Sequence, residues 1–302
     1  MTGAMASTLT ERGVLKIAGP DAGSFLQGLV TNNVDLAGPG TAIYAGLLTP
    51  QGKFLFDFFI TADPADQSAL LLDCDGARRD ALLKRLTLYK LRAKVTIEDV
   101  SETMAVAVLW HDDGTPMADG PGFADPRLAA MGRRVIAPAA KIKAAIAEAG
   151  AKAAPESTWH SLRIANGVGD AARDFEPDRT FPLEVNFAEM NGVDFHKGCF
   201  VGQEVTSRTK RRGSVRKRLL PVHVEGDMPE PGTPIKGGAR EIGTILSTDA
   251  ASARALALMR LDLIRSAVLE AGLAEIRPEI PAWLPVSLDG NGAEAGDGAA
   301  SE

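Results

Sequence analysis

Short apolar runs and helical patterns alternate over the first 165 residues. Apolar runs bounded by turn residues predict strands, whereas apolar residues spaced three and four apart predict helices. The predicted strands are residues 14–18, 42–48, 53–61, 70–73, 95–98, 104–110 and 133–136. The predicted helices open at residues 20, 80, 139 and 158. This alternation predicts an α+β fold in layers, with mainly antiparallel sheets.

The pattern changes at Leu219, after which only short β runs separated by Gly- and Pro-rich turns occur. Such a series predicts a small closed β-barrel. The acidic end of the chain lacks apolar residues and is predicted to be disordered. The predicted divisions are an α+β module at 1–100, a second α+β module at 101–217, the barrel at 218–286 and the tail at 287–302. The pattern leaves open whether the first two modules are continuous in sequence.

Composition narrows the class of protein. The chain has 302 residues, 45% of them hydrophobic and 24% charged, as in ordinary globular proteins. A net charge of -6 argues against a general nucleic-acid binder. No apolar run approaches the ~18 residues that span a bilayer, and residues 1–13 do not have the pattern of a secretory signal. The two cysteines, Cys74 and Cys199, suit a reducing compartment. We therefore expect a cytoplasmic protein without a membrane segment.

Candidate chemistry centres on Cys199, within the segment DFHKGCFVGQEVTSR at 194–208. Glycines at 198 and 202 indicate tight turns or a close approach of another group. Residues 203–210 suit a helix, whose dipole, together with Lys197 and Arg208, favours a thiolate at Cys199. The alternative interpretation is a small buried cysteine in a glycine-rich turn.

The octapeptide KGCFVGQE at 197–204, followed by Arg208 and Arg212-Gly213, resembles the signature of the YgfZ family. The run GPDAGSFLQGLVTNNV at 19–34 resembles a segment shared by that family and the glycine cleavage T-protein, an aminomethyltransferase. The resemblance implies a T-protein-like fold: two sheet-and-helix modules closed by a C-terminal barrel. It also implies that the protein binds tetrahydrofolate or another reduced folate. It further implies a role in iron–sulfur cluster assembly or repair, with assembly machinery or client enzymes as partners and indirect effects on tRNA thiolation.

The resemblance also suggests site residues. Lys197 and Cys199 would carry the chemistry, and Gln203, Glu204 and Arg208 of the same motif would contact the folate. In the T-protein, a glutamate after an Arg-Leu motif grips the pterin, but Ala165 stands at the matching position here. Glu184, with Asn186 beside it, is the candidate replacement, because a carboxylate accepts two hydrogen bonds from a pterin. A solvated loop carboxylate is the alternative interpretation of Glu184.

A second departure concerns the acidic pair of the T-protein. Its positions match Phe56-Asp57, so one carboxylate is missing and only Asp57 remains as a pocket residue. The alternative is that Asp57 faces solvent or a basic neighbour. We therefore expect no glycine-cleavage activity and leave open whether the protein catalyses any reaction.

Other charged and metal-binding residue types give weaker signals. Seven basic residues lie between 208 and 218. Three interpretations of this run are open: a solvated face, a binding site for the glutamate tail of a folate, or a contact with RNA. No histidine or cysteine has metal-ligand spacing, so no metal site is predicted. Cys74 is expected at a strand edge, as a structural thiol whose pKa is raised by Asp73 and Asp75.

Besides the assembly factor, the sequence leaves two hypotheses open: a folate-dependent aminomethyltransferase or other one-carbon transferase, and an RNA-interaction module.

Overall fold

The computed structural model describes residues 3–213, 215–264 and 268–286, which form two compact units. The first unit comprises Met1–Leu162, Glu176–Arg179 and Met190–Gln203. The second comprises Arg163–Phe175, Thr180–Glu189 and Glu204–Glu302. Among the described residues, no helix has both the length and the apolar character needed to cross a membrane.

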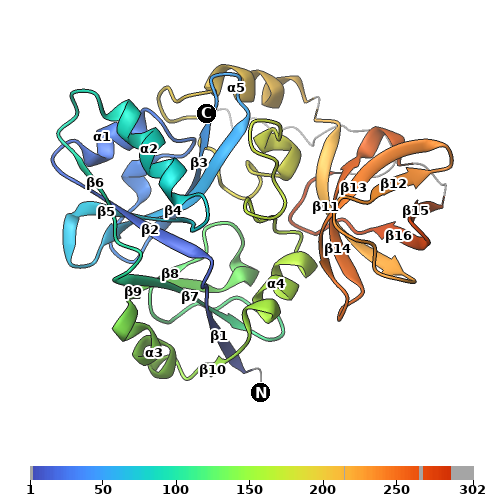
Figure 1. The fold of residues 1–302 in the computed structure, drawn as a ribbon, viewed down its shortest axis with the longest axis horizontal. Coiled ribbons are helices and arrows are strands. Elements are labelled where there is room, and N and C mark those ends of the chain that lie inside the picture. The colour runs from blue at the N-terminus through green and yellow to red at the C-terminus, as the bar shows by residue number, and fades with distance from the viewer. Residues whose placement is uncertain (1–2, 214, 265–267, 287–302) are drawn as a thin grey trace, which may run out of the picture. The chain divides into compact units, whose positions relative to one another are not determined.

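The first unit contains a five-stranded antiparallel sheet with two helices on one face (Figure 1). In sheet order its strands are β3 (Ala42–Leu48), β4 (Phe54–Asp63), β5 (Asp66–Asp75), β2 (Arg12–Ala18) and β6 (Thr96–Asp99). Helices α1 (Ala22–Gln27) and α2 (Arg79–Lys90) cover its apolar face. Phe56, Phe58 and Ile60 of β4 pack into this core with leucines from both helices. Because side chains alternate across a strand, Asp57 and Phe59 lie on the opposite face.

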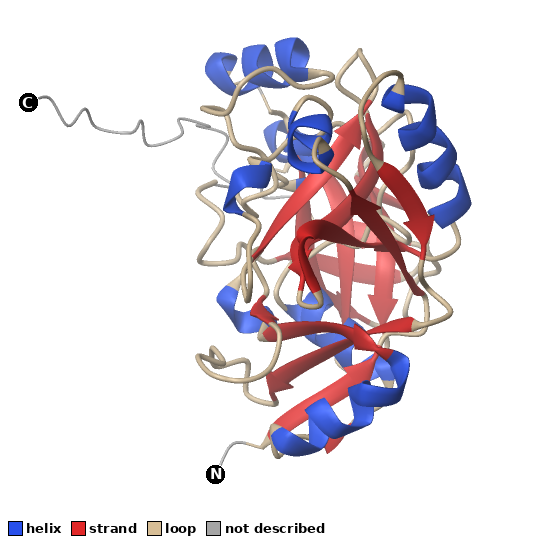
Figure 2. Ribbon diagram, turned by 90° about the vertical axis from the view of Figure 1, so that its left-hand side faces the viewer, coloured by secondary structure: helices blue, strands red, loops and turns tan. Residues whose placement is uncertain are grey.

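The same unit contains a second five-stranded sheet, which the N-terminal strand joins. In order, its strands are β10 (Lys152–Ala153), β1 (Ala4–Thr8), β7 (Met104–His111), β9 (Arg133–Pro138) and β8 (Phe123–Ala124). Helix α3 (Ala139–Glu148) packs on it through Ile142, beside Leu109 and Val135 (Figure 2). The opposite face meets the first sheet, where the rings of Phe59 and Phe123 lie 6.5 Å apart. The first unit is therefore layered helix, sheet, sheet, helix.

The second unit is built on a closed six-stranded barrel, as the sequence predicts. The strands, in barrel order, are β11 (Lys217–Glu225), β14 (Arg254–Arg260), β13 (Arg240–Asp249), β12 (Pro234–Gly237), β15 (Leu269–Ala271) and β16 (Ala274–Pro278). Every neighbouring pair is antiparallel. Fully buried aliphatic side chains such as Leu220, Ile235, Ile245 and Ala257 fill its interior.

The remaining elements connect these parts. They are α4 (Glu156–Ala165), α5 (Gln203–Arg212) and the 3-10 turns η1 (Val34–Leu36), η2 (Ala129–Met131), η3 (Pro182–Val185) and η4 (Leu261–Leu263). All predicted strands and helices are confirmed, with shifts of a few residues at their ends, whereas the short strands β1, β8, β10, β15 and β16 were not predicted. The predicted disordered tail lies outside the described residues, and the predicted domain boundaries stay a prediction.

Candidate functional site

Cys199 lies on a loop of the first unit, between Met190 and the start of α5 at Gln203. Its side chain is exposed, so the alternative of a buried structural cysteine is wrong. The helix predicted for 203–210 is confirmed as α5 (Gln203–Arg212), and Cys199 precedes it by four residues. His196 and Gly198 are also exposed. The loop therefore presents a thiol to solvent immediately before a helix.

Lys197 anchors this loop to the end of α1. Its side chain is only 7% exposed, and its Nζ donates hydrogen bonds to the carbonyl oxygens of Gln27, Val30 and Asn32 at 2.8, 2.7 and 2.8 Å. Burial lowers the pKa of Lys197 to about 8, while the carboxylates of Asp194 and Asp35 act in the opposite direction. An ammonium group has three donors, so this carbonyl cage uses all of them. The charged amine therefore holds the Cys199 loop to the segment that follows α1.

The residues that follow α1 hold the same loop from a second side. The Thr31 hydroxyl donates to the Gly192 carbonyl oxygen at 2.6 Å and accepts from the Gly46 amide at 2.8 Å. The Asn32 amide donates to the carbonyl oxygens of Tyr44 and Asn191. The Thr31 carbonyl oxygen in turn accepts from the Asp194 amide at 3.0 Å. Residues 19–34 and residues 197–203 of the second motif, which together carry most of the family resemblance, thus lie in one unit and are joined by hydrogen bonds.

The two glycines beside Cys199 have different roles. Gly202 has a φ of +85°, and a Cβ there would lie 2.7 Å from the Thr49 carbonyl oxygen and 3.0 Å from Gly52 Cα. Its lack of a side chain therefore lets the loop lie against the β3–β4 turn. At Gly198 a Cβ would meet nothing within 4 Å, and its φ is not positive. The prediction of a required glycine is confirmed at 202 and wrong at 198.

Asp57 lies on the face of β4 that meets the second sheet. It is buried and accepts a 2.8 Å hydrogen bond from the Tyr44 hydroxyl, so the interpretation of a solvent-facing carboxylate is wrong. Its negative charge contributes to the raised pKa of Arg127, which makes Arg127 its basic neighbour. The guanidinium of Arg127 stacks 5.4 Å from the Tyr44 ring centre. Phe56 faces the other way, into the helix-covered core, beneath the guanidinium of Arg78.

Further buried charges surround this position. Asp73 accepts from Arg12 Nε and Arg134 Nη1, both at 2.6 Å. Asp125 and Arg127 pair at 2.8 Å. Burial, the largest single effect, raises the pKa of Asp125, but the charge and hydrogen bonds of Arg127 together with the charge of Arg134 outweigh it, and the net shift is downward. Three arginines and three aspartates, counting Asp57, therefore lie between the sheets. Their opposite charges balance, which reduces the cost of burying them.

The predicted folate residues of the second unit lie at η3 and on α5. Glu184 of η3 is half-buried, and burial raises its pKa while Lys217 acts in the opposite direction. Asn186 is fully buried in the left-handed conformation that ends η3. Its amide donates to the Leu219 carbonyl oxygen at 2.7 Å, which joins η3 to the barrel. Glu204 and Arg208 of α5 are exposed. Asp57 and Gln203, the latter half-buried, belong to the first unit.

The arginine of the Arg163-Ile164-Ala165 motif is a structural residue of the second unit. Arg163 is buried and donates to Asp174 Oδ2 at 2.7 Å and to Ser247 Oγ at 2.6 Å. It thereby connects the segment after α4 to strand β13 of the barrel. Ala165, which replaces the pterin-binding glutamate, is exposed at the end of α4.

Cys74 needs a correction in two respects. Its strand β5 is the central strand of the first sheet, so the thiol is buried and does not lie at an edge. Burial is the largest cause that raises its pKa to about 12, and the neighbouring aspartates are smaller causes. The prediction of a structural thiol agrees with this environment.

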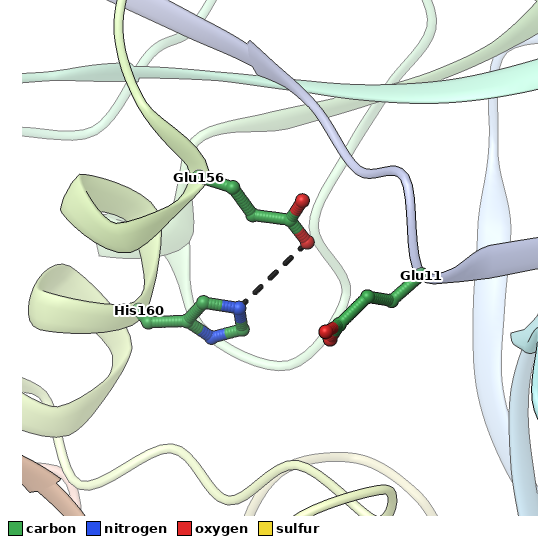
Figure 3. Close-up of side chains that lie close together, drawn as sticks. All are labelled: Glu11, Glu156 and His160. Carbon is green, nitrogen blue, oxygen red and sulfur yellow. Dashed lines mark ion pairs between the residues drawn. The ribbon is translucent and has the colours of Figure 1, made fainter.

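Glu11, Glu156 and His160 form a cluster in the first unit that sequence spacing did not reveal (Figure 3). Their ligand-type atoms all lie within 4.8 Å of one another. Glu156 accepts hydrogen bonds from the amide and hydroxyl of Thr10 at 3.2 and 3.1 Å, and His160 Nε2 lies 3.7 Å from its other oxygen. These contacts hold the first turn of α4 to the β1–β2 turn. The i, i+4 spacing of Glu156 and His160 was the available signal.

Comparison with known proteins agrees with this architecture. The family model described as GCVT N-terminal domain matches residues 6–110, and the model described as CAF17, C-terminal beta-barrel domain matches residues 216–286. The solved structure of glycine cleavage system aminomethyltransferase T from Bartonella henselae superposes with a TM-score of 0.72 at 13% identity, over 93% of this chain and 86% of that one. The fold is therefore of the T-protein class: α+β with two sheets and a closed barrel.

Closer relatives specify the family. Iron-sulfur cluster assembly factor IBA57, mitochondrial, of Mus musculus is 33% identical over 92% of this chain and 85% of its own. The Homo sapiens protein of the same name is 36% identical over 74% and 67%. A homologue from Mycosarcoma maydis is 39% identical over 70% of this chain, which spans 55% of its length. The chain belongs to the IBA57/YgfZ family of iron–sulfur cluster assembly factors.

Proposed function

We propose that this protein supports iron–sulfur cluster assembly or repair, with the thiol of Cys199 as its point of contact with a cluster. The observation that carries the proposal is the exposed thiol on a loop held by Lys197 and by the Thr31–Asn32 turn. A thiol whose preceding residues are anchored by these hydrogen bonds is positioned for a specific partner. The names of the mouse and human relatives support the same role.

The cluster is cargo in this proposal. Iron–sulfur clusters generally take four protein ligands, and the second cysteine of the chain is buried in the centre of a sheet. Cys199 would therefore supply one ligand, and the assembly machinery or the client enzyme would supply the others. Clients that thiolate tRNA belong to this class of partner. The relatives are named mitochondrial, whereas we propose a cytoplasmic location on the composition of this chain.

We also propose that the second unit binds a reduced folate. Glu184 is the proposed pterin contact because its carboxylate is half-buried, which raises its pKa. A ligand that covers this carboxylate would have to replace its water contacts, and the N–H groups of a pterin can donate two hydrogen bonds to it. Arg208 would pair with the glutamate tail, and Glu204 stays a predicted contact of the same unit, whereas Gln203 belongs to the first unit and stays a prediction from the motif alone. Asn186 would support η3, since its amide is bonded to Leu219. A bound tetrahydrofolate would serve as a carrier of one-carbon units.

A folate-dependent aminomethyltransferase is the second candidate, and Asp57 is the observation that favours it. Its buried carboxylate is oriented by the Tyr44 hydroxyl, as a positioned acid–base group would be. Phe56 points into the opposite core and cannot supply the second carboxylate. We expect glycine-cleavage turnover to be undetectable with the lipoylated carrier. Turnover near ~1 s⁻¹, the low end of ordinary enzyme rates, would instead support the transferase.

Ligand-induced stabilisation tests the folate site. Tetrahydrofolate at about a hundred times its dissociation constant should stabilise the protein by about 2.7 kcal/mol and raise its melting temperature. Glu184→Gln should reduce that shift, whereas Glu230→Gln, an exposed glutamate of the same unit, should not. An unchanged melting temperature at millimolar tetrahydrofolate would contradict the folate site.

Complementation tests the assembly role. In a strain that lacks the gene, we expect reduced activities of iron–sulfur enzymes, which the wild-type gene restores and Cys199→Ser does not. Equal protein levels of the two forms must be verified by immunoblotting. Full restoration by Cys199→Ser would refute the proposed role of the thiol but not the assembly role. Normal iron–sulfur enzyme activities in the deletion strain would refute the assembly role itself.

A further inference from the structure

The C-terminal end of α2 carries two exposed leucines side by side. Leu82 and Leu86 of this helix are fully buried in the core of the first unit, but Leu88 is 72% exposed and Leu91, at the C-cap, is 88% exposed. Residues three apart lie on the same side of a helix end. A single exposed leucine is ordinary on a protein surface. Two exposed together form an apolar tip at the end of α2, one of the two helices that Figure 1 shows against the first sheet.

The backbone at this tip has an unusual conformation. Leu91 has a φ of +43° and a ψ of -106°. Glycine or asparagine ordinarily occupies positive φ after a helix, and a branched side chain there is strained. Such residues cluster at functional positions because stability alone would replace them. The chain therefore maintains a large apolar side chain, in a strained conformation, in contact with water.

The sequence around the two leucines is basic, and the fold brings one anion to its end, where the Asp21 carboxylate accepts a 2.7 Å hydrogen bond from the Lys94 amide. Between Asp80 and Glu98 the chain contains no acidic residue, although its overall net charge is -6. The basic residues of this stretch are Lys84, Arg85, Lys90, Arg92 and Lys94. Lys84, Arg92 and Lys94 are exposed, and the other two are half-buried. These five cations with Leu88 and Leu91 are termed the α2 patch.

We propose that the α2 patch binds the surface of an anionic lipid bilayer. Leu88 and Leu91 enter the boundary between headgroups and acyl chains, and the cations contact lipid phosphates. Apolar side chains flanked by lysine and arginine are the composition of membrane-surface segments. A protein partner fits less well, because lysine is depleted from protein interfaces and supplies three of the five cations here. The proposal does not depend on the role of Cys199 or of folate.

Co-sedimentation with vesicles tests the proposal on the full chain. The wild-type protein should sediment with vesicles containing about 30% phosphatidylglycerol at low salt, and much less with pure phosphatidylcholine. Raising NaCl from about 0.05 to 0.5 M should release most of it, because the Debye length falls severalfold. The double variant Leu88→Ser/Leu91→Asn should weaken the partition coefficient at least about tenfold, since each leucine contributes hydrophobic burial.

Two controls separate binding from folding. Leu273→Ser removes a leucine that is 96% exposed on the β15–β16 turn, beside Glu270 and Glu275, and should leave vesicle binding unchanged. Asparagine tolerates a positive φ, so Leu91→Asn should keep or raise the melting temperature while it weakens binding. Equal binding to neutral and anionic vesicles would overturn the proposal, as would equal loss with Leu273→Ser. Absence of vesicle binding would also overturn it.

Discussion

The two cysteines have opposite environments, and this difference predicts their reactivity. Cys199 is exposed, whereas Cys74 is buried, which raises its pKa to about 12. Because the thiolate is the nucleophile, iodoacetamide should modify Cys199 in the native protein and Cys74 only after unfolding. Mass spectrometry of native and urea-unfolded samples distinguishes the sites, with Cys199→Ser as the control that stays unmodified when native. Equal labelling of both residues in the native protein would contradict the burial of Cys74.

Replacing Lys197 by methionine keeps the length of the side chain but removes all donors from the carbonyl cage. Three buried carbonyl oxygens then lose their partner. An unsatisfied buried polar group costs about 1–3 kcal/mol, so we expect a loss of about 2–4 kcal/mol in the free energy of unfolding, measured in urea. The exposed Lys236→Met should change it by less than about 0.5 kcal/mol. Faster native labelling of Cys199 in Lys197→Met would report a loosened loop.

The low pKa of Lys197 predicts a pH dependence with a definite sign. Burial lowers the pKa to about 8 from an ordinary value of 10.5. Between these values the unfolded chain binds a proton at this group that the folded chain does not, so the stability from this group rises with pH. Below pH 8 the cost of the buried charge is fully present. From pH 7 to 9 the wild type should gain about 1 kcal/mol relative to Lys197→Met. Parallel pH profiles of the two proteins would contradict the lowered pKa.

The sequence indicated Cys199 but not the partners of Lys197. The motif at 197–204 identified the loop, and the base-rich composition suggested that the lysine acts on the thiol. Its actual partners are main-chain carbonyl oxygens of Gln27, Val30 and Asn32, more than 160 positions away. Every residue has a carbonyl group, so no side-chain pattern marks such a cage. The burial of Asp57 was missed for a related reason, since the second sheet that buries it is distant in sequence, whereas the alternative of a basic neighbour agrees with Arg127.

At the scale of elements, the contact between the Cys199 loop and the β3–β4 hairpin depends on Gly202. Gly202→Ala places a Cβ 2.7 Å from a main-chain oxygen at a φ of +85°. Strain of this kind costs about 1–3 kcal/mol, so the melting temperature should fall and the amides of 198–202 should exchange hydrogen faster. Gly198→Ala is the matched control and should be tolerated, because the site is open. Equal effects of the two substitutions would refute the role assigned to Gly202.

The elements found from sequence differ from those missed in their length. Strands β3, β4, β7 and β11 contain long apolar runs, and the pattern located them within a few residues. Strands β8 and β10 contain two residues each, too few to show a period. Strand β1, AMAST, pairs with β7 and β10, and these tertiary contacts rather than its own residues define it. Local pattern therefore predicts strands with a long apolar run better than strands without one, whether they lie inside a sheet or at its edge.

At the scale of the whole molecule, the fold class followed from sequence and the layer contacts did not. The change at Leu219 from mixed elements to short strands correctly indicated the closed barrel. The pairing of the two sheets in the first unit depends on charged residues, which ordinarily indicate surface. Asp73 and Arg134 are almost fully buried, at 0% and 3% exposure. The charge of these residues therefore gave the wrong expectation of an exposed position where the two sheets meet.

This inter-sheet cluster predicts a large effect of a single substitution. Arg134→Met leaves Asp73 paired with Arg12 and removes the stacking of Arg134 on the Phe59 ring, whose centre lies 4.0 Å from the guanidinium. Removing one partner of a buried ion pair typically costs 3–5 kcal/mol, because the other charge stays buried.

The matched control is Arg277→Gln, which breaks the exposed pair with Glu225 in the barrel, where both side chains are more than half exposed. Exposed pairs contribute about 0–1 kcal/mol. Urea unfolding should therefore show a large loss for Arg134→Met and almost none for Arg277→Gln. Removing Asp73 would leave Arg12 without its carboxylate, so the variant that tests the role of charge is Arg12→Met/Arg134→Met/Asp73→Leu, which removes all three charges. It should recover part of the loss. If it is no more stable than Arg134→Met, the cost lies in lost packing between the sheets and not in an uncompensated charge.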